Sequence, residues 1–336
     1  MLIFARIHIR VIAAAILLCF ARSDVWAGVI RHDRSIHPYN QLALRPEFAS
    51  AGYIFHPSVG FWHTGTLVAP NKVLTCAHAF DPDGTGQITR PTDQLLFGFD
   101  PTPLQGTTYQ VVDVLLHPMW PNRPAEHDLA LLVLDKPVLD VIPAKLAAVN
   151  PLNQTAVSVG YGIQADGYGN ELGEGQQRLA YENVINYIGP DDGKLRDFLQ
   201  LPDEIEIGVT LRADFDSPFE QHNSYGSPSP LDLEGASETG DSGGPLFVNH
   251  NGEWYVAGVL FGGFNPYQEI GYGTINLWSP LFSQENHAFL SDHGIEVLSR
   301  LHAEVPEPLT VTMIVSGACS LLLLRHRRKQ PRQPQE

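Results

Sequence analysis

Short runs of β-forming residues, separated by clusters of Gly, Pro, Asn and Asp, recur along most of this 336-residue chain. Runs of this length bounded by turn formers are typical of strands joined by tight loops. The 30 Gly and 26 Pro also indicate many turns. We therefore expect an all-β body in two halves that meet near residues 143–153. The expected strands lie at residues 52–55, 64–68, 72–75, 109–116, 129–134, 156–160, 182–188, 205–212, 245–248 and 254–261.

One helix is expected at the end of this body, over residues 283–301, where apolar residues recur at helical spacing. Gly294 weakens the middle of that helix. The segments 162–175 and 216–234 are rich in Gly, Asn, Ser, Pro and acidic residues, and we expect both to be surface loops.

Composition excludes several classes of protein. With 43% hydrophobic and 17% charged residues, the chain is not disordered, and its net charge of -16 argues against a nucleic-acid partner. Three cysteines, at positions 19, 76 and 319, allow at most one disulfide. A fold held by many disulfides is therefore excluded, and no zinc pattern is visible.

The N-terminus has the pattern of a secretory signal. Arg6 and Arg10 precede the apolar run 11–21, and Val25 and Ala27 place small residues where a signal peptidase inspects the chain. The alternative, a buried helix, is disfavoured because the run follows a basic start and is too short to span a bilayer. We expect signal peptidase to remove residues 1–27.

The C-terminus combines Val305–Pro308, the uncharged run 309–324 and a basic cluster at 325–329. A run of 16 residues is somewhat short for a membrane span, but flanking residues can extend it. The three parts together resemble the PEP-CTERM sorting signal, which implies a bacterial source with an exosortase as processing partner and transient membrane attachment through 305–329. A plain C-terminal anchor is the alternative, and residues 330–336 form a short tail.

Three segments carry residues suited to nucleophilic chemistry. Gly240 to Pro245 reads GDSGGP and precedes a strand, His78 ends the strand-like run 73–78, and Asp128 opens the apolar run 129–134. Glycines beside Ser242 allow a tight turn that exposes its hydroxyl. Taken singly, each of the three residues is more typical of a structural role.

Taken together, in the order His, Asp, Ser, these segments resemble the signatures of the trypsin/chymotrypsin-like serine endopeptidases. The resemblance extends from about Val29 to Phe282. It implies two six-stranded antiparallel β-barrels packed face to face, followed by a C-terminal helix. The first barrel would occupy residues 28–147, and the second barrel with the helix residues 148–304.

The resemblance also implies a secreted hydrolase that acts on protein or peptide substrates without a cofactor or metal. Ser242 would be the nucleophile, His78 its base, and Asp128 the group that orients His78. The backbone amides of Gly240 and Ser242 would form the oxyanion hole. The expected location is the cell surface or the medium after sorting.

Asp241 would be the activation partner, pairing with an α-amino group at Val29 or Ile30, and with less weight at Gly28. Family analogy places Ala236 at the floor of the substrate pocket and Gly263 and Gly271 near its walls, which favours an apolar or small side chain before the scissile bond. If Asp232 and Glu234 reached into that pocket, a basic preference would return.

Two alternatives to an endopeptidase stay open: a catalytically silent surface binding module and an esterase with the same three residues. His127 is expected to be an exposed neighbour of Asp128, because alternation along a strand points it the other way. Residues 81–86 resemble part of a calcium loop but lack its third acidic position, which favours a solvated turn.

Overall fold

The computed structural model describes residues 28–57, 60–172, 177–199, 206–219, 221–226, 229–267 and 271–298. The predicted signal peptide and C-terminal sorting segment lie outside these ranges. Within them, no helix is long and apolar enough to cross a bilayer. Strands dominate the described residues, so the all-β prediction is confirmed.

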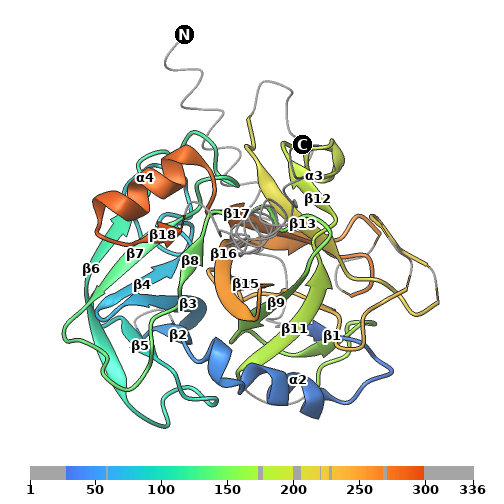
Figure 1. Ribbon diagram of the computed structural model, residues 1–336, viewed down its shortest axis with the longest axis horizontal. Helices are drawn as coiled ribbons and strands as arrows, with labels where there is room; N and C mark the ends of the chain where they lie inside the picture. The colour runs from blue at the N-terminus through green and yellow to red at the C-terminus, as the bar shows by residue number, and fades with distance from the viewer. Residues whose placement is uncertain are drawn as a thin grey trace, which may run out of the picture. The chain divides into compact units, whose positions relative to one another are not determined.

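Six strands of the first half close into an antiparallel barrel in the order β2-β3-β4-β7-β6-β5 (Figure 1). Side chains alternate between inside and outside along the first part of β6, so Tyr109 and Val111 are buried in the barrel core while Val112 is exposed. A register shift between Val111 and Asp113 then returns Val114 to the core. The predicted first barrel is confirmed, with the strands β2 (Ala51–His56), β3 (Phe61–Ala69), β4 (Lys72–Thr75), β5 (Leu96–Gly98), β6 (Thr108–Leu116) and β7 (Ala130–Leu134).

The second half is an open, half-barrel sheet rather than a second closed barrel, in the order β11-β9-β15-β16-β17-β13-β12. Its strands are β9 (Thr155–Gly160), β11 (Leu179–Val184), β12 (Tyr187–Gly189), β13 (Thr210–Asp214), β15 (Pro245–His250), β16 (Glu253–Phe264) and β17 (Ile275–Pro280). Two short strands, β8 (Leu146–Ala147) and β18 (Val297–Leu298), join this sheet from its side.

The reason for the open sheet lies at the outer edge of β11. Its inner edge pairs with β9, whereas Glu182 donates its amide to Leu233 O, and the Asn183 side chain donates to Gly235 O. A loop segment thus takes the hydrogen bonds that a closing strand would need. The prediction that the second half closes into a six-stranded barrel is therefore wrong.

The N-terminal residues pack on this second half. Strand β1 (Val29–Ile30) pairs with β10 (Ala165–Asp166) and β14 (Gly235–Ala236), and helix α2 (Ile36–Ala43) lies against β11 (Figure 1). A 3-10 helix, η1 (Pro46–Phe48), then leads into the first barrel.

Three predictions at the level of elements need correction. Helix α4 spans only Gln284–Asp292, because Gly294 has φ 72° and the chain then enters β18. The run 182–188 divides between β11 and β12. The segment 205–212 holds only the first part of β13, and helix α3 (Lys194–Leu199) precedes it.

The halves share one hydrophobic core. Leu74, Leu129 and Leu131 of the first barrel belong to the same buried cluster as Val157 and Phe247 of the second sheet. His78, Asp128 and Ser242 lie next to strands that contribute to this cluster, after β4, before β7 and before β15 respectively.

Candidate active site

His78 and Asp128 meet because of strand pairing in the first barrel. His78 follows β4 and Asp128 precedes β7, and these strands pair antiparallel with Thr75 opposite Ala130. The His78 Nδ1 atom lies 2.6 Å from Asp128 Oδ2, and the backbone amide of His78 donates to Asp128 Oδ1 at 2.8 Å. Both carboxylate oxygens thus hold the same histidine, through its backbone amide and its Nδ1 atom.

The electrostatics of this pair stabilise the imidazole once it takes up a proton. Asp128 is fully buried, and the His78 side chain is 13% exposed. Burial lowers the pKa of His78, but the Asp128 carboxylate and, more weakly, Cys76 raise it above its usual value. Aspartate at this place therefore increases the proton affinity of the ring that would act as a base.

Ser242 lies in the turn that leads into β15, and the neighbouring glycines shape this turn. Gly240 and Gly243 have φ of 98° and 83°, a region that suits glycine. Thr64 of β3 donates its amide to Ser242 O at 3.0 Å, and its hydroxyl donates to Gly240 O at 2.9 Å. The turn is thereby fixed against the barrel that supplies His78.

The backbone amides of this turn fall into two groups, those that donate to a protein acceptor and those that do not. Those of Asp241, Gly243 and Gly244 donate to the carbonyl oxygens of Glu238, Leu260 and Asp241. The amides of Gly240 and Ser242 have no protein acceptor among the residues that the structure describes. An oxyanion hole requires two donors of this kind close to the nucleophile.

Asp241 is buried and accepts three backbone amides on its two oxygens, from Gly28 at 3.0 Å, Gly162 at 2.9 Å and Glu238 at 3.0 Å. Burial raises the pKa of the Asp241 carboxyl to about 6, although the amide donors act in the opposite direction. Among the three candidate nitrogens of the N-terminus, the structure places that of Gly28 beside this carboxylate, because Val29 and Ile30 pair within β1.

The predicted pocket residues lie on neighbouring segments of the second half. Ala236, on β14, is fully buried with Val29, Phe215 and Tyr272. Gly263 is on β16, where an added Cβ would lie 3.1 Å from Ser237 Oγ. Gly271 has φ 109°, and its carbonyl accepts from Asn265 and Thr274.

The amino-acid sequence is also similar to those of known proteins. The sequence profile of the family described as "Trypsin-like peptidase domain" matches residues 63–259, a stretch that includes His78, Asp128 and Ser242. The chain belongs to the trypsin-like peptidase family. Membership indicates a serine peptidase.

Two relatives share low sequence identity with this chain. A trypsin from Simulium vittatum is 26% identical over 219 residues, which cover 65% of this chain and 75% of the relative. A trypsin from Saccharopolyspora erythraea is 27% identical over 197 residues, covering 55% of this chain and 70% of the relative. Both alignments support the same trypsin-like family.

The structure tests two predictions about residues near the site, one for His127 and one for Asp81. His127 is fully buried, stacks on His117 at 4.8 Å between ring centroids, and contacts Asn286 of α4, so the prediction of exposure is wrong. The reason is that His127 lies in a turn before β7, where strand alternation does not apply. The sequence predicts a solvated turn at residues 81–86, but Asp81 is fully buried and accepts hydrogen bonds from Thr85, Gly86 and Trp120, so the turn closes around this carboxylate.

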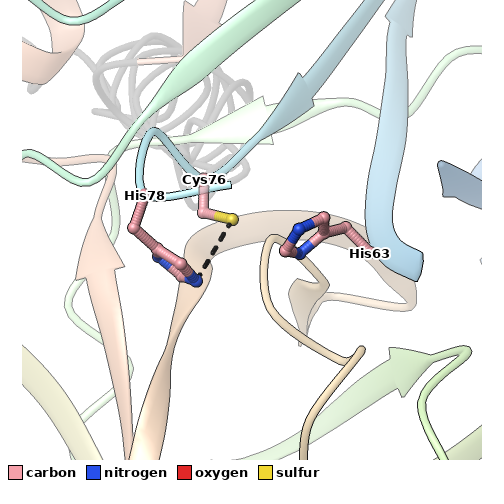
Figure 2. Close-up of side chains that lie close together, drawn as sticks. All are labelled: His63, Cys76 and His78. Atoms are coloured by element: carbon pink, nitrogen blue, oxygen red, sulfur yellow. Dashed lines mark hydrogen bonds between the residues drawn. The ribbon is translucent and has the colours of Figure 1, made fainter. Parts of the chain in front are cut away.

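Sequence reasoning missed three residues at this site. Thr64 ties the Ser242 turn to the barrel, and the short segment Thr64–Thr66 gave no signal of that role. Cys76 lies with its sulfur 3.7 Å from His78 Nε2, and the ring of His63 is 6.1 Å from that of His78 between centroids (Figure 2). Burial lowers the pKa of His63 well below its usual value.

Proposed function

We propose that the chain is a serine endopeptidase that cleaves peptide bonds through an acyl-enzyme, with Ser242 as nucleophile. The observation that carries this proposal is the His78–Asp128 pair, held at 2.6 Å and supplied by the barrel to which the Ser242 turn is bound. A serine hydroxyl is a poor nucleophile at neutral pH, and a neighbouring imidazole is the usual base.

In the acylation step, His78 Nε2 takes the proton of Ser242 as Oγ attacks the scissile carbonyl carbon. The carbonyl oxygen becomes an oxyanion, which accepts from the amides of Gly240 and Ser242. His78 then gives its proton to the departing amine, and the C–N bond breaks. Water repeats the sequence on the acyl-enzyme and releases the acid, while Asp128 stabilises the charged ring throughout.

Activation follows from signal removal in this proposal. Cleavage after Ala27 turns the Gly28 nitrogen, 3.0 Å from Asp241 Oδ2, into an α-ammonium group. A neutral amide contact becomes a charge-assisted one, which is about twice as strong. The charge also favours the ionised carboxylate, and thereby fixes the turn whose amides form the oxyanion hole.

For specificity, we infer an apolar or small side chain before the scissile bond. The support is that the floor residue Ala236 offers no charge and that both acidic alternatives are engaged elsewhere. Asp232 pairs with Arg34 at 2.9 Å, and Glu234 accepts from the amides of Asp216 and Leu231. Neither carboxylate is thus directed at Ala236, since Asp232 pairs with Arg34 at the surface and Glu234 is held by the two amides.

We also propose that the enzyme is exported by its N-terminal signal, is sorted through the 305–329 segment with an exosortase as partner, and acts at the cell surface or in the medium. The support for this location is the sequence pattern at each end. Mass spectrometry of both termini of the protein from its natural host tests it. A mature chain that retains residues 1–27 would contradict export by signal cleavage.

The central experiment combines a fluorophosphonate probe with a peptide library, applied to the expressed chain and its Ser242→Ala variant. We expect covalent labelling and peptide cleavage with the parent and neither with the variant. Ser291→Ala, an exposed serine on α4, is the matched control and should label like the parent. Labelling with ester turnover alone would identify an esterase, and the absence of labelling would identify a silent binding module.

A further inference from the structure

Three side chains of types that bind metal ions lie close together, where the Cys76 sulfur approaches His78 Nε2. His63 is on β3, and Cys76 and His78 are on the segment after β4, its hairpin partner. One donor atom from each residue lies within 4.8 Å of the other two, and Cys76 Sγ is 3.7 Å from His78 Nε2. Figure 2 shows the sulfur between the two rings.

These distances fit a small tetrahedral ion. With Zn–S near ~2.3 Å and Zn–N near ~2.0 Å, tetrahedral geometry requires about 3.6 Å between sulfur and nitrogen and about 3.3 Å between the two nitrogens. The Cys76–His78 separation already meets the first requirement. The His63 nitrogen lies within 4.8 Å of both other donors, so it must move closer by at most about 1.5 Å when a metal binds.

The chemistry of the donors selects the metal. One thiolate and two imidazoles favour Zn²⁺ and similar thiophilic ions over Mg²⁺ or Ca²⁺, which prefer oxygen. Cys76 is fully buried and His63 is 2% exposed, so bulk water does not compete for these two ligands. Three protein ligands and one water form a common arrangement for zinc.

A carboxylate also contacts the other ring nitrogen of His78. Histidines that bind metal through one ring nitrogen usually donate the other ring N–H to a carboxylate, which fixes the tautomer. His78 Nδ1 contacts Asp128 Oδ2 at 2.6 Å, so the ring presents its Nε2 lone pair toward Cys76. The contact with Asp128 thus orients His78 Nε2 for metal binding, as it also orients the same atom to accept a proton.

We propose that His63, Cys76 and His78 form a site for a thiophilic divalent cation of the Zn²⁺ class, and that its occupancy switches the peptidase off. Binding converts the Cys76 thiol to a metal thiolate with release of one proton, and it engages the Nε2 lone pair of His78. That lone pair then cannot accept the Ser242 proton. The switching part of this inference rests on the proposed function, whereas metal binding does not.

Binding is tested on the full chain with Ser242→Ala, which prevents self-digestion, under reducing conditions. We expect Co²⁺ to produce a thiolate charge-transfer band that one equivalent of Zn²⁺ displaces. Cys76→Ser should abolish the band, and His63→Gln should weaken Co²⁺ binding by on the order of tenfold or more. A missing band, or one that survives Cys76→Ser, would overturn the site.

His127→Gln provides the matched control, because Glu126, His127 and Glu285 form a second group of donors. In that group His127 Nδ1 contacts Asn286, Glu126 Oε2 accepts from the Val209 amide, and there is no thiol to give a thiolate band. The cobalt band should persist in this variant. Loss of the band with His127→Gln would show that cobalt binding does not depend on His63, Cys76 and His78 alone, and would overturn the proposal.

Switching is measured with Ser242 intact, as the ratio of peptide hydrolysis with and without Zn²⁺ within each chain. The parent should lose most activity and regain it with a chelator, while Cys76→Ala should show a ratio near one. Equal inhibition of both chains would overturn the switch. A chain that shows the cobalt band but cleaves no peptide would retain the metal site and remove the proposed function instead.

Discussion

Gly243, directly after the proposed nucleophile, is a position where both backbone and surroundings exclude a side chain. Its φ is 83°, and an added Cβ would lie 2.1 Å from Thr75 Oγ1 and 2.4 Å from Thr64 O. Those two atoms also bond to each other, since the Thr75 hydroxyl donates to Thr64 O at 2.8 Å. The turn can therefore approach the barrel this closely only with glycine.

Gly243→Ala should lower kcat/KM by at least about a hundredfold, because a shift of roughly 1 Å in the turn misplaces the nucleophile. Gly252→Ala is a matched control, with φ 87° but nothing within 4 Å of the added Cβ. It should cost only about 1–2 kcal/mol of stability through its backbone and leave kcat/KM unchanged. Hydrolysis kinetics and thermal unfolding of both variants test this, and equal kcat/KM values would contradict it.

At the residue scale, the sequence marks the proposed catalytic residues more clearly than the residues that hold them in place. His78, Asp128 and Ser242 lie in segments with recognisable neighbours, so the resemblance predicted them as a group. Thr64 and His63 act through contacts made by folding, with partners up to 176 positions away in the chain. No local pattern marks such a residue.

At the scale of elements, the loop from β13 to β14 buries two carboxyl groups. Asp216 is 7% exposed and Glu234 is 3% exposed, and the Asp216 amide donates to Glu234 Oε1 at 2.7 Å. Burial, together with neighbouring carboxylates, raises the pKa of Asp216 to about 9 and that of Glu234 to about 7. The folded chain therefore holds protons that the unfolded chain releases.

Stability should fall as the pH rises from about 4 through the raised pKa values, because the folded state binds more protons than the unfolded state in that range. Asp216→Asn removes one of these groups and should stabilise the fold at pH 8 by about 1–3 kcal/mol, with less gain at pH 5. Urea unfolding at both pH values measures the difference. Asp93→Asn, on an exposed loop, is the control, and an Asp216→Asn gain that does not depend on pH would oppose this account.

Elements were predictable from sequence in proportion to their length. Strands such as β6 and β16 extend over 9 and 12 residues and show their period or apolar character directly. The two-residue strands β1, β10 and β14 are defined by their pairing with one another, and helix α2 is defined by its packing on β11. The open edge of β11 likewise depends on a loop segment that carries no strand pattern.

At the scale of the molecule, the proposed site is assembled from three separate parts of the chain. The barrel supplies His78 and Asp128, the second sheet supplies Ser242, and the N-terminal segment reaches Asp241 across a separation of 213 residues. Buried contacts fix that segment, since Ile30 and Tyr39 pack with Leu179 and Tyr181. The position of the first described residue is therefore set by the second half.

Two extra residues before Gly28 should lower kcat/KM by roughly ten- to a hundredfold, because a buried charge-assisted contact of about 1.5–3 kcal/mol is lost. The measurement compares a chain that begins at Gly28 with one that retains Trp26 and Ala27, each verified by mass spectrometry. Asp241→Asn should reduce the activity of the first chain much more than that of the second. An extended chain with unchanged kcat/KM would contradict activation through Gly28.

The place of this N-terminal segment has a consequence for the order of folding. Residues 29–43 emerge first during synthesis, yet their partners on β10, β11 and β14 follow more than a hundred residues later. The first barrel, whose strand pairs all lie within residues 51–134, can form before those partners exist. The proposed site is thus complete only after most of the chain has been synthesised, and a partly made chain lacks the proposed nucleophile, Ser242.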